Sequence, residues 1–444
     1  MTAVVGIMNK RGIAIAADSA VTQRIRGNKK ISNTGNKMLR LSSVNPVSIM
    51  LTGNACLFYT QWDIIVRRYR QKFGDIPFPT VQAQLEDFFS YIPTEELFMP
   101  DDIQKEYLNN TLSVYWDRVV ECVPLMRLSR EKGAKRSDII NAFHERISSG
   151  RVYSKKQGTL PKFTNYTETQ FRDYLGTMVD DLFKLKVYDN TSDCVDKKSS
   201  HHGMKKHFSA DILEEIKDEF ISGFYDYMTG AWSRGDAHLV FSGFGAKEDY
   251  PVLICARVDH GFDGRICYHI KEEDIFKISD KRPVAICPFA QTDIMEGLLN
   301  GIDPDFLENI CKENTYLFET FHKQIDLNES FGKEDIKELE NLLKSVRYKD
   351  LTKKLERFGI SLCKSNMNDW LKALSDYDLQ NMAHLAENLI ALTSFERHMT
   401  FQQEGVGGPI DVAVISKNKG FTWLNRKSWY HHKDVGGRYG KLGV

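Results

Sequence analysis

Long apolar runs are missing from this sequence of 444 residues. No stretch reaches the roughly 18 uninterrupted apolar residues of a membrane-spanning helix, so no membrane span is expected. The opening MTAVVGIMNKRGIAIAADS also lacks the order of a secretory signal, because Lys10 and Arg11 interrupt the apolar run instead of preceding it. A charge surplus is missing too, since Lys plus Arg and Asp plus Glu both total 60. Nucleic-acid-binding proteins normally show a basic surplus, so no nucleic-acid partner is expected.

Paired cysteines and familiar cofactor motifs are also missing. The eight cysteines are scattered without a C-x-x-C, which indicates a reduced, cytoplasmic setting. No Walker lysine motif or G-x-S-x-G elbow occurs, and Gly405-x-Gly407-Gly408 leads into an expected strand instead of a helix. His201-His202 and His431-His432 lie in polar segments without ligand spacing. Neither a metal nor a cofactor is therefore expected.

What is present is an alternation of β-rich and helical regions. Residues 3–8 and 12–17 are apolar runs around the polar turn Asn9-Lys10-Arg11, the pattern of a hairpin of two buried strands. Further strands are expected at 37–41, 47–52, 237–243, 251–258, 265–270, 410–416 and 420–425. Between them, from about 57 to 235 and from about 289 to 400, apolar residues recur three and four apart, which predicts helices.

Strands at both ends with helices between them favour one sheet-based core built from distant segments, with helical insertions. The expected fold class is therefore α+β. The expected division of the chain is a core formed by residues 1–57, 236–301 and 386–444, with mainly helical insertions at 58–235 and 302–385.

The candidate chemistry begins at Thr2. If Met1 is removed, Thr2 gains a free α-amine beside its own hydroxyl, and an α-amine with a pKa near ~7.7–8.0 can act as a general base. Nucleophile and base then belong to one residue. With Met1 retained this mechanism cannot run. A Met-Thr start alone is common and carries little weight.

The residues after Thr2 strengthen this interpretation. Thr2 is followed by AVVGIM, a turn, GIAIA and then Ala16-Ala17-Asp18-Ser19, and Lys37-Met38-Leu39-Arg40-Leu41 precedes an apolar strand that ends at Gly53. In type, order and spacing this resembles the proteasome β-subunit and HslV family of threonine hydrolases, which are N-terminal-nucleophile (Ntn) hydrolases. The resemblance covers about the first 55 residues. It implies a four-layer αββα sandwich, here interrupted by the helical insertions.

The resemblance also implies a role for each matching residue. Thr2 Oγ would attack a peptide or amide carbonyl, Lys37 would lie near Thr2 and favour the alkoxide, Asp18 would pair with Lys37, and the Gly53 N–H would stabilise the oxyanion. Each has a simpler alternative: Asp18 could cap a turn, Lys37 could be a solvated strand residue, and Gly53 could permit a bend. Lys30 is a rival for the role of Lys37, because the loop length is uncertain.

Two departures from the family pattern leave a second hypothesis open. Glu404-x-x-Gly407-Gly408 stands where the family has Asp-x-x-Ser-Gly before its final strand, with Glu for Asp and Gly for Ser. A non-catalytic Ntn-fold scaffold or partner-binding protein is the alternative to a hydrolase. The resemblance implies a peptide or amide substrate and a homo-oligomer, and an unfoldase is a conceivable partner.

Overall fold

The computed structural model describes residues 2–25, 28–33, 35–120, 136–186, 208, 210–231, 237–303, 348–399 and 406–427, with a few helical positions between 306 and 320. For 22–25, 28–31 and 348–352 it describes the backbone alone. Met1, Glu404, His201-His202 and His431-His432 lie outside the described residues. The architecture is mixed α+β, with several antiparallel sheets and many helices.

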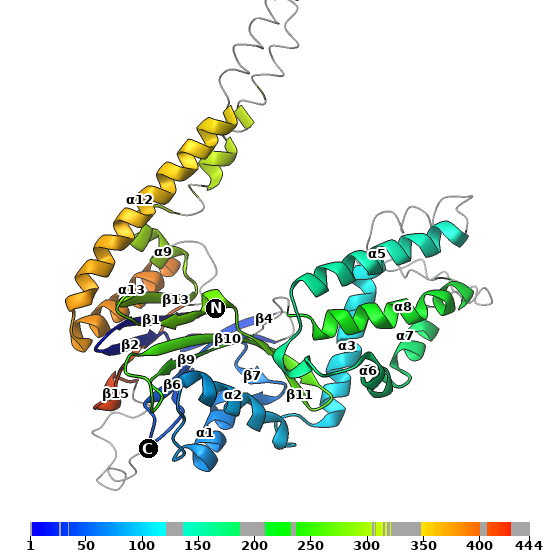
Figure 1. The fold of residues 1–444 in the computed structure, drawn as a ribbon, viewed down its shortest axis with the longest axis horizontal. Coiled ribbons are helices and arrows are strands. Elements are labelled where there is room, and N and C mark those ends of the chain that lie inside the picture. Colours follow the sequence, from blue (N-terminus) through cyan, green and yellow to red (C-terminus); the bar gives the residue numbers. More distant parts are fainter. Residues whose placement is uncertain are drawn as a thin grey trace, which may run out of the picture.

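The first sheet gathers strands from the two ends and the middle of the chain. Its order is β13-β1-β2-β14-β15, and every neighbouring pair is antiparallel. Its strands are β1 Ala3–Asn9, β2 Gly12–Ala17, β13 Val284–Ala290, β14 Asp411–Ser416 and β15 Gly420–Asn425. The N-terminal hairpin therefore lies at the centre of the sheet, which explains why its apolar runs are buried on both faces (Figure 1).

The second sheet has the order β11-β10-β9-β6-β5, with the short β12 also paired to β10. It too is antiparallel throughout. Its strands are β5 Met38–Arg40, β6 Val47–Gly53, β9 Ala237–Gly243, β10 Val252–Phe262, β11 Arg265–His269 and β12 Ile275–Lys277. Two small ribbons complete the β structure: β3 Val21–Ile25 with β4 Asn28–Ser32, and β7 Cys56–Leu57 with β8 Thr60–Gln61.

The two sheets pack face to face on a shared apolar core. Val4 and Met8 of the first sheet belong to the same buried cluster as Met50 and Leu253 of the second. A Cβ added at Gly6 would lie 2.7 Å from Leu253 Cδ1, so a larger residue there would require the Leu253 side chain to move. The intervening residues Ala3, Val5 and Ile7 point the other way, into a different cluster.

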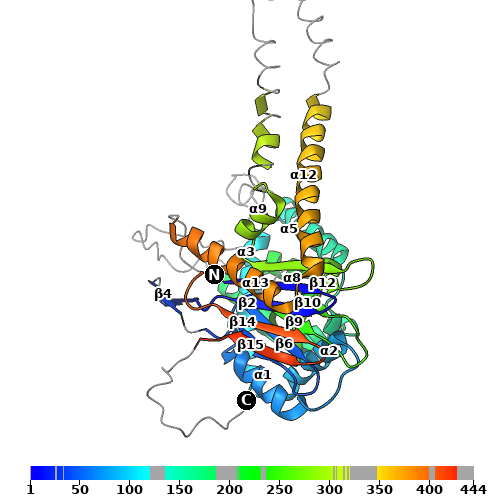
Figure 2. The same cartoon turned by 90° about the vertical axis from the view of Figure 1, so that its left-hand side faces the viewer.

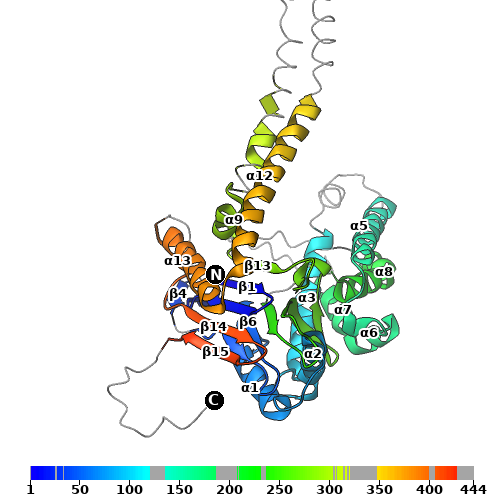
Figure 3. The same ribbon diagram turned by 60° about the vertical axis from the view of Figure 1, so that its left-hand side comes forward.

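Helices cover the outer face of each sheet (Figure 2). On the first sheet these are α9 Asp293–Asn300, α12 Tyr348–Asp376 and α13 Leu379–Met399. On the second they are α1 Trp62–Phe73 and α2 Val81–Tyr91, the latter capped by the Thr80 hydroxyl. The far part of α12 runs outward from the sheets (Figure 3). Among the described helices, none has both the length and the apolar character needed to cross a bilayer.

A separate helical unit lies beside the sheets (Figure 1). It comprises α3 Asp101–Val120, α5 Arg136–Lys156, α6 Glu168–Leu175, α7 Met178–Lys186 and α8 Ala210–Thr229. A short 3-10 turn, Pro161–Phe163, lies between α5 and α6. Two others lie outside this unit, Ile92–Thr94 after α2 and Glu272–Asp274 before β12. The unit has its own aromatic-rich core, which Phe262 and Cys267 of the second sheet join at one edge.

The expected strands and helical regions agree with this structure, including the N-terminal hairpin and the strands near 237–270 and 410–425. Six strands were not expected: β3, β4, the two-residue β7 and β8, the short β12, and β13. The β3–β4 ribbon is polar and so gave no apolar pattern, while β13 contains Pro288 and lies next to a helical region. The division of the chain into core and insertion segments stays a prediction.

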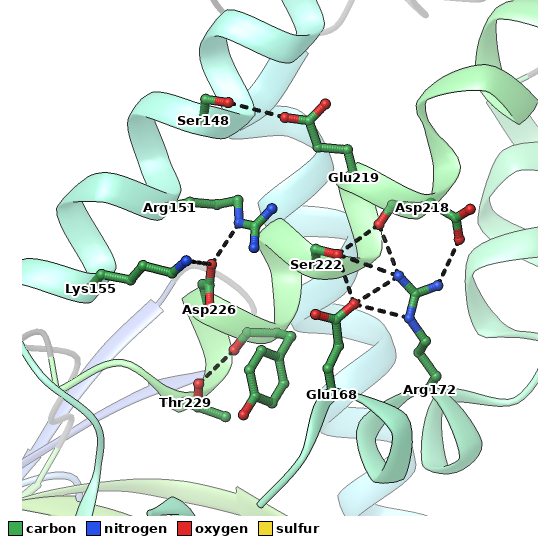
Figure 4. Close-up of polar contacts among 11 residues, drawn as sticks. Ser148, Arg151, Lys155, Glu168, Arg172, Asp218, Glu219, Ser222, Asp226 and Thr229 are labelled. Atoms are coloured by element: carbon green, nitrogen blue, oxygen red, sulfur yellow. Dashed lines mark hydrogen bonds and ion pairs between the residues drawn. The ribbon is translucent and has the colours of Figure 1, made fainter.

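Ion pairs join the helices of the helical unit (Figure 4). Arg151 on α5 donates to Asp226 on α8 at 2.7 Å, with Lys155 at 3.9 Å, and the Asp226 side chain is only 11% exposed. Arg172 on α6 bonds Asp218 on α8 at 2.8 Å, but the Asp218 side chain is 92% exposed. Since solvent weakens exposed pairs, Asp226 is the carboxylate expected to matter for stability.

We expect Asp226→Asn to lower the free energy of unfolding by about 1–3 kcal/mol, because Arg151 loses a partly buried charged partner. Asp218→Asn, the matched control on the same helix, should change it by less than about 0.5 kcal/mol. Urea denaturation of the three proteins measures both values. Equal losses in the two variants would contradict the importance assigned to burial.

Candidate functional site

The first residue of the site is held in place by its neighbours in the first sheet. Thr2 directly precedes β1 and is 8% exposed. The N–H of Ala3 donates to Asp18 Oδ1 (2.9 Å), and the Asp18 N–H donates to the Ala3 carbonyl (3.2 Å). On the other side of β1, the Gln291 N–H donates to the Thr2 carbonyl (3.2 Å). The backbone at Thr2 is therefore fixed from both sides.

The Asp18 carboxylate, which follows β2, is buried and fully hydrogen-bonded. Its Oδ1 accepts from Ala3 N–H and from Lys37 Nζ, the latter at 2.6 Å. Its Oδ2 accepts from Ala20 N–H (3.1 Å) and Gly407 N–H (3.0 Å). A carboxylate buried in this way needs such donors, because an unpaired buried charge is very unfavourable. Asp18 thus links the start of β1 to Lys37 and to the segment before β14.

Lys37 reaches Asp18 from the second sheet. It precedes β5, and its carbonyl accepts from the Leu51 N–H of β6 (2.8 Å), which continues the strand pairing by one residue. Burial lowers the pKa of the Lys37 amine, and the Coulomb attraction and hydrogen bond of Asp18 oppose that lowering. Lys427 lowers this pKa further, and Asp411 raises it. The amine is thus a buried cation whose proton affinity depends on its neighbours.

Gly53 is the last residue of β6 and lies two residues after Leu51, whose N–H bonds the Lys37 carbonyl. It is exposed, pairs with Ala237, and has a φ of 78°. A backbone with that positive φ favours glycine strongly, and an exposed glycine leaves its main chain open to close approach.

Of the predicted site residues, the structure brings Thr2, Asp18 and Lys37 together, with Gly53 on the adjoining strand. Lys37 is the lysine whose side chain bonds Asp18. Its rival Lys30 lies in β4, within the stretch where only the backbone is described.

Sequence reasoning named Gly407 only as a departure from the family pattern, and it missed Lys427 and Asp411. Gly407 acts through its backbone, donating to Asp18 and accepting from the Ser19 N–H (3.1 Å). Lys427 and Asp411 form a second buried ion pair beside the first. A backbone contact leaves no residue-type signal, and no short-range pattern connects Lys427 with residues near 20. These contributors therefore needed the three-dimensional structure.

Comparison of the chain with models of known protein families finds no match, and comparison with curated proteins finds none either. In the part of the chain that the structure describes, no group of three or more His, Cys, Asp or Glu side chains is arranged to hold a metal ion.

The role of Gly407 can be separated from that of Gly408 by substitution. Among the described residues, a Cβ at Gly407 would have only Ser394 Oγ within 4 Å, at 3.7 Å. A Cβ at Gly408 would lie 2.7 Å from Asn33 Cβ, on a backbone with φ of 76°. We expect Gly407→Ala to be neutral and Gly408→Ala to lower the free energy of unfolding by about 1–3 kcal/mol. Chemical denaturation checks this, and a larger loss for Gly407→Ala would refute it.

The lowered pKa of Lys37 predicts a pH-dependent stability. Between that folded-state pKa and the ordinary value of 10.5, the unfolded chain binds more protons, so stability rises with pH in this window. We expect the free energy of unfolding of the wild-type protein, relative to Lys37→Met, to increase as the pH approaches about 10.4.

Urea denaturation at several alkaline pH values measures that difference. Lys10→Met is the control with the opposite sign, because the exposed Lys10 pairs with Asp280 and its pKa is raised. If the difference in free energy of unfolding between the wild type and Lys37→Met stays flat or falls as the pH rises, the lowered pKa of Lys37 is wrong.

Proposed function

We propose that the chain is an N-terminal threonine hydrolase of the proteasome-like Ntn type, which cleaves peptide or amide bonds with Thr2 as nucleophile after removal of Met1. The observation that carries this proposal is the buried Lys37–Asp18 pair at 2.6 Å, with Asp18 also bonded to the N–H of the residue after Thr2. A buried lysine held next to a chain start is an expensive arrangement unless its charge is used.

The proposed reaction follows from these positions. The free α-amine of Thr2 accepts the proton of its own hydroxyl, and Oγ attacks the substrate carbonyl. The Lys37 ammonium stabilises the developing negative charge, while Asp18 keeps that ammonium protonated and directed. The Gly53 N–H, on the adjoining strand, is proposed as the donor to the oxyanion. The α-amine then returns its proton to the leaving amine as the C–N bond breaks, which leaves an ester on Thr2 Oγ. Water, deprotonated by the same α-amine, attacks that ester, and the acid product leaves as the Thr2 hydroxyl takes the proton back.

The layer order is consistent with the proposed Ntn sandwich. Two antiparallel sheets share a core, α9, α12 and α13 cover one outer face, and α1 and α2 cover the other. In this proposal the two sheets are the catalytic core. The helical unit from α3 to α8 is then an addition at one edge of the second sheet.

A non-catalytic Ntn-fold scaffold is the second candidate. The observation in its favour is Gly407, which supplies only a backbone N–H to Asp18 where the family pattern has a serine. A site that has lost side-chain groups around its nucleophile can retain the fold without the reaction.

The first test is the N-terminus itself. We expect intact-mass analysis and N-terminal peptide mapping of the native protein to show Thr2 as the first residue. Thr2→Ala should then reduce hydrolysis of a panel of fluorogenic peptide amides by at least about a thousandfold, because the nucleophile is gone.

Thr2→Ser is the matched control, since it keeps a hydroxyl beside the α-amine and should retain measurable turnover. An electrophilic peptide probe should label Thr2 in the wild-type protein. Unchanged turnover in Thr2→Ala rules out the mechanism. A processed protein that neither hydrolyses the panel nor reacts with the probe supports the scaffold.

A further inference from the structure

Lys427 follows β15 and is buried beside the candidate site. Its ammonium donates to the Asp411 carboxylate, to Ser19 Oγ at 3.0 Å and to the Gly35 carbonyl at 2.8 Å. An ammonium has three donors, so all of them are used. The main-chain N–H of Lys427 also donates to the second oxygen of Asp411, at 2.8 Å. Asp411 therefore holds residue 427 by both its backbone and its side chain.

The two segments that Lys427 joins each carry a residue of the candidate site. Ser19 directly follows Asp18, and Gly35 lies two residues before Lys37. The Gly35 N–H also donates to the Ser19 carbonyl, at 3.0 Å. The hydrogen bonds of Lys427 thus connect the loop that contains Asp18 with the loop that contains Lys37. Rotation or separation of the two loops would break its hydrogen bonds.

The contact between Lys427 and Ser19 resembles a Ser–Lys nucleophile pair, but the geometry does not fit that role. Ser19 is fully buried, and its hydroxyl already donates its proton to the Pro409 carbonyl at 2.7 Å. The Lys427 ammonium is a donor in this contact and is paired with Asp411. Ser19 is therefore a structural acceptor, which leaves positioning as the role of the contact.

The second ion pair also acts on Lys37 through its charges. Asp18 is the carboxylate bonded to Lys37, and among the described residues Lys427 and Asp411 are the further charged groups that affect the Lys37 amine. Lys427 disfavours the protonated amine and Asp411 favours it, so together they add little net charge. Removing either one alone would leave an uncompensated charge near Lys37.

We propose that the buried Lys427–Asp411 pair is a positioning element that holds Lys37 against Asp18 and balances the charge around the Lys37 amine. Its relevance to catalysis rests on the proposed threonine hydrolase, but its effect on Lys37 does not require a substrate. The C-terminal hairpin β14–β15 is then part of the site's machinery as well as of the first sheet.

The test is a titration of Lys37 by NMR on lysine-labelled protein, with the signal assigned by Lys37→Arg. Lys427→Met should raise the proton affinity of Lys37 by about tenfold, because a nearby cation is lost. Asp411→Asn should lower it by a similar factor, because a nearby anion is lost. A merely structural role would not give opposite signs for the two variants.

Lys417→Met is the matched control, because Lys417 lies on the same hairpin but pairs at 2.9 Å with the exposed Asp249. It should leave the titration of Lys37 unchanged.

The double variant Lys427→Met/Asp411→Asn buries no unpaired charge, so it should fold even if a single variant does not. In it, the Lys37 titration should lie near that of the wild type, while kcat falls about ten- to hundredfold with KM largely retained.

Lys37 titrations that are unchanged, or that move in the same direction in both single variants, overturn the charge-balancing role. A double variant with wild-type kcat overturns the positioning role while leaving the hydrolase intact. Absence of hydrolysis in the wild-type protein overturns the proposed function alone, since opposite shifts of Lys37 would still establish the pair's effect on that amine.

Discussion

The hydrogen bonds of the Asp18 carboxylate hold together the chain segments that form the candidate site. The carboxylate accepts hydrogen bonds from Ala3, Ala20, Lys37 and Gly407, and the last of these lies 389 residues away along the chain. A buried carboxylate is very unfavourable without its donors. Moving any one of these segments would therefore both break a hydrogen bond and leave the buried charge less well compensated. The starts of β1 and β5 and the approach to β14 are thus held in register with one another.

The sheets and the helical unit have different hydrophobic cores. The cluster between the sheets and the clusters beneath the outer helices fix the strands that carry Thr2, Lys37 and Gly53. The helical unit buries a separate aromatic core, which Phe262 and Cys267 of the second sheet join. Tyr107 of α3 also contacts Asp259 and His260 of β10. The separate core of the helical unit is consistent with an addition to a sheet-based core.

The sequence contained enough to predict the hairpins and much of the helix content, because apolar periodicity is local. It also predicted Asp18 and Lys37 as partners, through a resemblance confined to the first 55 residues or so. β13 escaped prediction because Pro288 interrupts a strand pattern, yet an edge strand tolerates proline. The contact of Lys427 with Ser19 spans 408 residues, and no periodic pattern encodes it. Local sequence patterns predict individual strands and helices. Which distant residues meet at the candidate site depends instead on the order of the strands in the sheets.

Burial distinguishes the two ion pairs at the site from the others in the molecule. Most pairs between helices have at least one well-exposed partner, as Arg172 and Asp218 do, and contribute little. Lys37–Asp18 and Lys427–Asp411 are instead almost completely buried on both sides. Apolar residues of similar volume often stabilise a protein as well as or better than a buried ion pair, so stability alone gives no reason for two such pairs side by side. Their position next to the start of β1 agrees with the proposed use of a fixed positive charge at Thr2.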